Sequence, residues 1–479
     1  MRKVEPAQLE IGGAFIEDVE ICPKSRDDIP ALLLGMQHLY AAVELRKRLF
    51  ALLDSEINPD VRKDTGRPGM DLWSILVLAI LKQGLGCDWD RLCELANQHQ
   101  ALRQMMGHGW VGPKYEMQTV IDNVSLLSPS LLAKVNELLV GAGHKVAGKK
   151  PGEPLRGRCD SFCAETDVHY PTSWNLLWDA MRCTVRHAAQ LAGSLKLGGW
   201  RQHRHVAHGM IKRAFNRVRT AKLAKRSPER VEAYVAVCEQ VLARARETLQ
   251  EAERLPKSAS QEAEMARLRY FMEHAGRQID QIRRRVLQGE TIPHEEKVFS
   301  IFEPHTRWVA KGKAGTPQEL GVPVCVIEDQ HRFILHHRIM WQGHDVDHAA
   351  GMVSEAQQSF PELRACSFDR GFHSPRNQRR LAVLLDEPAL PVKGHLNAEA
   401  AGRQSTPWFQ AARKQHPAVE SAINHLEHCG LDRVRSHGAD GFARSVSLSV
   451  LAANVKRLGR LLREQERRRL RRRRRLRAA

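Results

Sequence analysis

The chain has 479 residues, of which 42% are hydrophobic, and a formal net charge of +19 with a pI near 9.7. This length allows two or three domains with full cores, and the basic excess favours a polyanionic partner, nucleic acid or an acidic membrane surface. The ten cysteines include no Cys-x-x-Cys pair and no zinc-finger spacing, which predicts reduced thiols in a cytosolic protein. No apolar signal core follows Met1, and the longest apolar run, 72–81, is too short to cross a bilayer.

The positive charge is concentrated at the C-terminal end. Thirteen basic and two acidic residues lie between Lys456 and Arg477, so the tail 456–479 carries a net charge of +11. Runs of like charge are often disordered, but arginines that release counterions from DNA add affinity that does not depend on base sequence. We expect that deleting residues 463–479 weakens DNA binding and flattens its salt dependence.

The first part of the chain, 1–145, is predicted to be an all-helical domain that binds DNA ends, mediates multimerisation, or does both. Apolar residues recur at helical spacing between Leu34 and Leu53, and Asp71 is a good N-cap for a helix over 72–82. Further helices are predicted over 89–98, 100–106 and 128–141. Short helices around a glycine-bearing turn can form a helix-turn-helix, and a bundle that only holds subunits together fits equally well. Residues 142–157, rich in Gly, Lys and Pro, are predicted to be a linker.

A long helical insertion is predicted over 175–296. Ser227-Pro228 is an N-cap and first-turn pair, and a three-four apolar repeat then runs from Val231 to Ala252. A break near Pro256 and a second helix over 261–287 predict an antiparallel helical hairpin. Its basic residues could contact DNA, although a solvated face is the commoner meaning of such charge: Arg213, Lys222, Lys225, Arg226, Arg283, Arg284 and Arg285.

The remaining segments, 157–174 and 297–455, are predicted to form an α/β domain. Strands are expected over 158–163, 298–302, 322–328, 333–340, 365–368 and 389–392, and helices over 347–359, 375–385, 417–429 and 445–462. With the insertion set aside, this order of elements is that of an RNase H-like mixed sheet. In such a sheet the strand of 158–163 is central and the strand of 365–368 lies beside it.

Three acids are candidates for catalysis in that arrangement. Asp160 lies inside a strand, where an unpaired charge is costly, and Asp369 ends a strand before a helix, where open α/β sheets bind ligands. The helix of 417–429 carries Glu420 across the sheet. Converging carboxylates repel one another unless cations lie between them, and their oxygens suit Mg²⁺ or Mn²⁺. Two such ions can activate a water or a 3′-hydroxyl and stabilise the leaving oxygen at phosphorus.

Several alternatives remain open around these acids. Asp167 competes with Asp160 as a loop carboxylate, and Glu427 lies two turns from Glu420 on the same helical face, which makes it a rival metal ligand. His169 and His373 are predicted to be hydrogen-bonding neighbours of the acids rather than metal ligands. Lys393 could contact a phosphate or be solvated.

Three collinear segments carry a family resemblance: Asp-Ser-Phe-Cys-Ala-Glu-Thr-Asp-Val-His-Tyr-Pro-Thr at 160–172, Ser-Phe-Asp-Arg-Gly-Phe-His-Ser-Pro at 367–375, and His-Pro-Ala-Val-Glu-Ser-Ala-Ile-Asn at 416–424. With Gly430-Leu431-Asp432-Arg433 and Asn454, they resemble the ISNCY type of DDE transposase from bacterial insertion sequences. The resemblance covers about residues 30–460 and puts Asp160, Asp369 and Glu420 in the DDE positions. Arg413, His416 and Glu427 depart from it, because related transposases have a tyrosine, an arginine and a lysine there.

The resemblance implies a Mg²⁺-dependent enzyme that cleaves DNA at the ends of its own element and transfers the freed strands to a target. It implies that the partners are double-stranded DNA, namely terminal inverted repeats and target DNA, and that the protein is a homodimer. No association with a membrane is expected, and the expected location is the bacterial cytoplasm, with the nucleoid. Two other functions are kept open. One is a catalytically inactive DNA-binding protein derived from a transposase, and the other is a metal-dependent nuclease without strand transfer.

Overall fold

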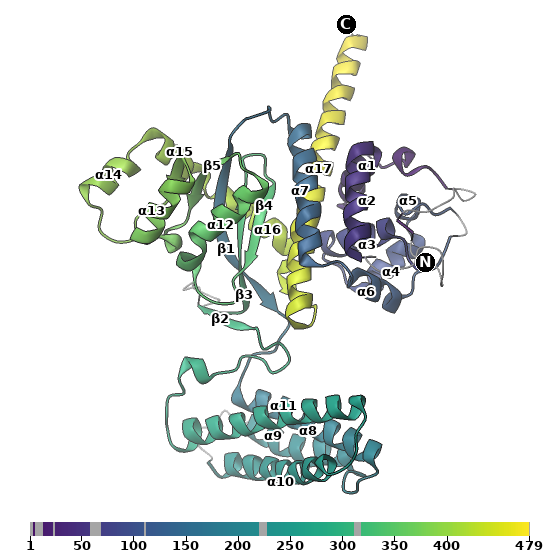
Figure 1. The fold of residues 1–479 in the computed structure, drawn as a ribbon, viewed down its shortest axis with the longest axis vertical. Coiled ribbons are helices and arrows are strands. Elements are labelled where there is room, and N and C mark those ends of the chain that lie inside the picture. Colours follow the sequence, from purple (N-terminus) through teal and green to yellow (C-terminus); the bar gives the residue numbers. More distant parts are fainter. Residues whose placement is uncertain are drawn as a thin grey trace. The chain divides into compact units, whose positions relative to one another are not determined.

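The structure, a computed structural model, describes residues 3–4, 13–22, 24–57, 69–109, 112–219, 228–310 and 318–478. The chain divides into two compact units. The helical unit is Val168–Trp308, and the sheet unit consists of Met1–Asp167 with Val309–Ala479 (Figure 1). The helical unit thus has wider bounds than the expected insertion of 175–296.

A seven-stranded mixed sheet is the centre of the sheet unit, so the prediction of an α/β fold is confirmed. The strands run in the order β2-β3-β1-β5-β6, with β4 paired to β3 and β7 paired to β1. β1 is antiparallel to β3 and parallel to β5, and β5 is parallel to β6. Their bounds are β1 Leu155–Thr166, β2 Arg307–Ala310, β3 Gln318–Glu328, β4 Ile334–Ile339, β5 Leu363–Phe368, β6 Glu387–Ala389 and β7 Arg433–Val434.

β1 is buried on both faces, because its side chains alternate between two cores. Cys159 belongs to a core that also contains Phe368 of β5 and Met352 of the helix α12 (Asp345–Ser359). Phe162 and Ala164 belong to a second core, beneath helices that follow β6 in the chain. Asp160 therefore points to the face that Phe162 shares.

Four helices around the sheet lie where helices were predicted: α12, α13 (Pro375–Leu384), α16 (Ala418–Leu426) and α17 (Gly438–Ala478). Two others, α14 (Ala398–Gln404) and α15 (Pro407–Gln415), lie where no helix was predicted. The expected strand over 298–302 is wrong: Phe299 packs against Trp308 and Phe302 against Phe271, in irregular backbone. The basic tail is also more ordered than a run of like charge suggests, because α17 continues through it.

The N-terminal helices share one hydrophobic core with the sheet. Helix α17 packs against α1, α3 and α7, and the fully buried Lys456 of α17 donates hydrogen bonds to Asp28 Oδ2 and to the carbonyl of Gly84. The predicted linker is shorter than expected, because α7 runs to Ala147. The helices are α1 Ile29–Ala41, α2 Val43–Ile57, α3 Leu72–Gly84, α4 Trp89–Gln98, α5 Gln100–Met105, α6 Met117–Val124 and α7 Pro129–Ala147.

The helical unit has its own core, built by α8 (Ser173–Leu195), α9 (Lys212–Arg219), α10 (Pro228–Glu253) and α11 (Ala259–Ile282). Because α8 packs against both α10 and α11, the unit is a bundle rather than the expected two-helix hairpin. Among the described residues, no single helix is long and apolar enough to cross a membrane; the bent pair α6 and α7 reaches that length only when its members are taken together.

Candidate active site

The parallel pair β1–β5 brings two of the predicted acids together. The last registered pair of these strands is Cys159 with Phe368, so Asp160 and Asp369 are the next residues on neighbouring strands. Such strands lie about 4.8 Å apart. Asp369 keeps an extended backbone, with φ −74° and ψ 163°, so alternation turns both carboxylates to the face opposite Cys159 and Phe368.

Glu420 reaches the same place from a different element. It lies in the first turn of α16, which packs on the face of β1 that carries Phe162, and its side chain is exposed. Burial raises the pKa of Asp160 to about 6, and a 2.8 Å hydrogen bond from the Ser161 amide opposes this shift. The charges of Asp369, Asp345 and Glu420 raise the pKa further. The structure thus brings Asp369 and Glu420 close enough for their charges to act on Asp160.

Asp345 is a fourth carboxylate, which the sequence analysis missed. It is the first residue of α12, and its Oδ1 accepts a 2.7 Å hydrogen bond from the Ser161 hydroxyl. An acid in the first turn of a helix is common because it favours the helix dipole, so its sequence position carries no further signal. Its contact with Ser161 brings its charge near Asp160, and this contact joins elements far apart in the chain.

His416 also lies among the acids, although the sequence indicated it only as a departure from the family pattern. Its Nδ1 is 3.0 Å from the Ser367 hydroxyl. Burial lowers its pKa, whereas the charges of Asp369 and Glu420 raise it. This contact ties the junction of α15 and α16, and with it Glu420, to strand β5.

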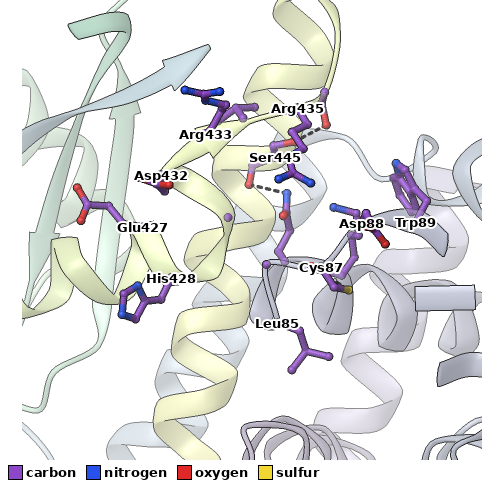
Figure 2. Close-up of a pocket in the computed structure, with 16 residues that line it drawn as sticks. Leu85, Cys87, Asp88, Trp89, Glu427, His428, Asp432, Arg433, Arg435 and Ser445 are labelled. Atoms are coloured by element: carbon purple, nitrogen blue, oxygen red, sulfur yellow. Dashed lines mark hydrogen bonds between the residues drawn. The ribbon is translucent and has the colours of Figure 1, made fainter. Parts of the chain in front are cut away.

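The two rival acids lie in other surroundings. Asp167 is half-exposed, and its Oδ1 is 3.6 Å from Arg433 Nη1. Glu427 lines a pocket of about 350 Å³, which Lys82, Asp88 and Arg435 also line. In Figure 2, Glu427 and His428 lie on one side of this pocket, and Cys87, Asp88 and Trp89 lie on the other.

The remaining candidates are His169, His373 and Lys393. His169 Nε2 is 2.5 Å from Asp179 Oδ2, and this hydrogen bond raises the pKa of His169. Burial lowers the pKa of His373, which also lies near the charge of Arg403. His169 is therefore a hydrogen-bonding residue, as expected, but its partner is Asp179. Lys393 is exposed.

The acid cluster suits a hard divalent cation in its chemistry. Carboxylate oxygens are the ligands that Mg²⁺ and Mn²⁺ prefer, and the repulsion around Asp160 is what a bound cation relieves. As the side chains lie, no three His, Cys, Asp or Glu residues within the described part of the chain are close enough together to hold a metal ion. Asp369 and Glu420 are exposed, whereas Asp160 is partly buried.

Comparisons with known proteins identify no relative of this chain. No family model, no curated protein and no solved structure matches the chain.

Proposed function

We propose that this protein is a DDE transposase with an RNase H-like catalytic sheet, which cleaves DNA at insertion-sequence ends and transfers the strands with Mg²⁺. The observation that carries the proposal is the convergence of Asp160, Asp369 and Glu420 on one face of the β1–β5 pair. The strand path β4-β3-β1-β5-β6, with β3 antiparallel to its neighbours, supports the RNase H-like assignment. The net charge of +19 supports a nucleic-acid partner.

In this mechanism Asp160, Asp369 and Glu420 would hold two Mg²⁺ or Mn²⁺ ions. Bound there, the ions would supply Lewis-acid activation of the attacking oxygen and charge stabilisation of the leaving oxygen. The chain's own residues orient the ligands. The Ser161 amide holds one oxygen of Asp160, and the Ser367–His416 contact fixes the base of the helix that carries Glu420.

The chemistry then consists of two displacements at phosphorus. Water attacks the phosphodiester at the end of the element, the bond to the 3′-oxygen breaks, and a 3′-hydroxyl is left. That hydroxyl attacks a phosphodiester of the target, and the 3′-oxygen of the target strand leaves. Neither step needs a covalent bond to the protein. Paired ends favour a homodimer, acting in the bacterial cytoplasm.

One observation favours a second function. The acids are not yet at metal-binding distance from one another within the described residues. A transposase-derived protein that binds DNA without cleaving it would need no closed metal site.

The test is cleavage and joining of duplex DNA that carries the element's ends, with Mg²⁺. We expect Asp369→Asn to lower the cleavage rate by about 10³-fold or more, because it removes a metal-bound charge worth several kcal/mol. The matched control is Asp386→Asn, an exposed acid after α13, which should act like the wild type. Activity in both variants would contradict the proposal. Its absence from the wild type as well would favour the inactive binder, and cleavage without joined products would identify a nuclease.

A further inference from the structure

Six exposed cations flank the acid cluster along the chain, and we call them the basic rim: Arg370, Arg376, Arg379, Arg380, Arg413 and Lys414. Arg370 follows Asp369 directly. Arg413 and Lys414 lie at the end of α15, just before His416, and the Arg413 charge acts on His416. Along the chain, the rim therefore follows Asp369 directly and ends a few residues before Glu420.

The α13 part of the rim lies on one side of a firmly anchored helix. Arg376, Arg379 and Arg380 are three and four residues apart, a spacing that places side chains together on a helix surface. A neighbouring side holds the helix in place, because the Asn377 side chain donates hydrogen bonds to the carbonyls of Val346 and Phe372, at 2.6 and 2.8 Å. Leu381 is fully buried in the core.

Both helices of the rim pack against the same edge strand. α13 and α15 each contact β6, and Figure 1 shows α13, α14 and α15 gathered beside β5. The rim helices thus lie at the β6 border of the sheet, next to β5, the strand that ends before Asp369. A polymer whose phosphodiester reaches the acids would run past this border.

None of the six rim side chains forms an ion pair or a hydrogen bond with a carboxylate of the described residues, whereas Arg403 of the nearby α14 pairs with Glu399 at 3.7 Å. Like charges at this spacing repel one another and are destabilising. A polyanion would relieve that repulsion. Duplex DNA fits, because it carries one phosphate charge for about every 1.7 Å of its axis.

We propose that the basic rim binds the sugar-phosphate backbone of double-stranded DNA on either side of the phosphodiester that enters the acid cluster. This inference deepens the proposed function and rests on it for the position of the DNA. The binding itself is independent of cleavage and is measured without a divalent metal.

The experiment compares Arg376→Gln/Arg379→Gln/Arg380→Gln with the wild-type full chain. Affinity for duplex DNA of arbitrary sequence is measured across salt in EDTA. Each lost phosphate contact lowers the log–log salt slope by about 0.9, so the triple variant should lose about 2–3 units of slope. The matching Arg-to-Lys triple should keep the slope, because it keeps the charges.

A charge-matched control comes from α11. Arg267, Arg269 and Arg277 are ion-paired with Glu264, Glu253 and Glu273, and changing all three to Gln removes the same charge. This control should keep the wild-type slope. An equal loss of slope in both triples would show an effect of net charge and would overturn the inference, as would an unchanged slope in the α13 triple.

Two further arms test the choice of partner and separate this inference from the proposed function. Tighter binding to duplex RNA or to anionic phosphatidylserine vesicles than to DNA, lost in the α13 triple, would overturn DNA as the partner. If the α13 triple variant keeps the wild-type salt slope while Asp369→Asn abolishes cleavage, the inference about the basic rim is wrong and the proposed function stands. If the α13 triple variant has a reduced salt slope while Asp369→Asn leaves cleavage unchanged, DNA binding by the basic rim is supported and the proposed function is contradicted.

Discussion

Two groups of arginines in this protein differ in their partners. In the helical unit Arg283 contacts Glu239 at 2.6 and 2.9 Å, and Arg284 contacts Glu296 at 2.6 Å. On α13, beside the edge strand β6, Arg376, Arg379 and Arg380 have no carboxylate partner among the described residues. Composition alone does not separate these two states. The ion pairs of the folded chain separate them, because the charge of a paired guanidinium is already balanced by a carboxylate of the protein.

The candidates for DNA contact in the helical insertion include both kinds of arginine. Arg283 and Arg284 have acids of the same unit as partners, whereas Arg213 and Arg285 are exposed and form no ion pair within the described residues. Three further candidates, Lys222, Lys225 and Arg226, lie outside the described residues.

The largest effect expected in this comparison comes from the arginine-rich end of α17. Truncation after Glu466 removes nine arginines but keeps Arg463, which donates to the carbonyl of Ser25, and Gln465, which donates to the carbonyl of Val146. We expect duplex-DNA affinity to fall by about 10²-fold or more at 0.15 M salt, with a flatter salt dependence. Fluorescence anisotropy across salt measures both. An unchanged slope would mean that this segment does not contact DNA.

A paired charge should cost stability when its partner is removed. Lys456 is 1% exposed, and Asp28→Ala leaves its ammonium with the Gly84 carbonyl as acceptor. We expect a loss of about 2 kcal/mol in the free energy of unfolding, less than for a fully buried pair because the Asp28 side chain is 45% exposed. Arg460→Gln, which removes the exposed partner of the same carboxylate, should cost about 0.5 kcal/mol or less.

The Asp28 effect should depend on pH in a defined direction. Burial would raise the pKa of Asp28, but pairing with Lys456 and Arg460 outweighs burial and lowers it. The stabilisation is therefore present above the ordinary pKa of 3.8 and is lost as the pH falls below it. Urea unfolding at pH 7 and pH 3 should show the difference between wild type and Asp28→Ala shrinking in acid. A constant difference would argue against the ion pair.

The charge of Asp160 should affect stability in the opposite direction to the charge of Asp28. The pKa of Asp160 is raised to about 6, so its ionised form disfavours the fold, and this cost grows as the pH rises from 3.8 to about 6. In EDTA at pH 8, Asp160→Asn should stabilise the protein by about 1 kcal/mol, below the full value of the shift because Asp160 is partly exposed. The gain should vanish near pH 4.

Asp167→Asn is the matched control for that measurement. Asp167 is half-exposed and paired with Arg433, so this change should give no gain in the melting temperature at pH 8. An equal gain in both variants would show a general effect of net charge rather than repulsion among Asp160, Asp369 and Asp345.

The smallest effect is expected from an exposed pair of the helical unit. Both side chains of the Arg283–Glu239 pair are 42% exposed, so Arg283→Gln should cost about 0.5 kcal/mol of stability. Its DNA salt slope should stay that of the wild type. A lower slope would show that paired arginines of this unit also contact DNA, and the contrast between the two groups of arginines would then fail.

Much of the fold was accessible from the sequence, because its signals are local. Asp71 caps α3 through the Ser74 amide, and periodicity correctly predicted β3 and β5 within a few residues. The expected strand at 298–302 failed because a short apolar run has the same pattern whether its side chains enter a sheet or an aromatic cluster.

In the candidate site, too, some residues were predictable from the sequence and others were not. The order of elements predicted that Asp160 and Asp369 would be neighbours, since it predicts which strands pair. Asp345 and His416 were missed because their contacts, with Ser161 and Ser367, join elements far apart in the chain. The rim was missed for a related reason, since pairing of a surface charge depends on its neighbours in space.

The most direct test of the central claim is a crystal structure of the protein soaked in Mn²⁺, with the ions located by anomalous scattering. The account predicts Mn²⁺ bound by the carboxylates of Asp160, Asp369 and Glu420. Mn²⁺ bound at Asp167 or Glu427 instead, or these three carboxylates left without metal at saturating Mn²⁺, would contradict it.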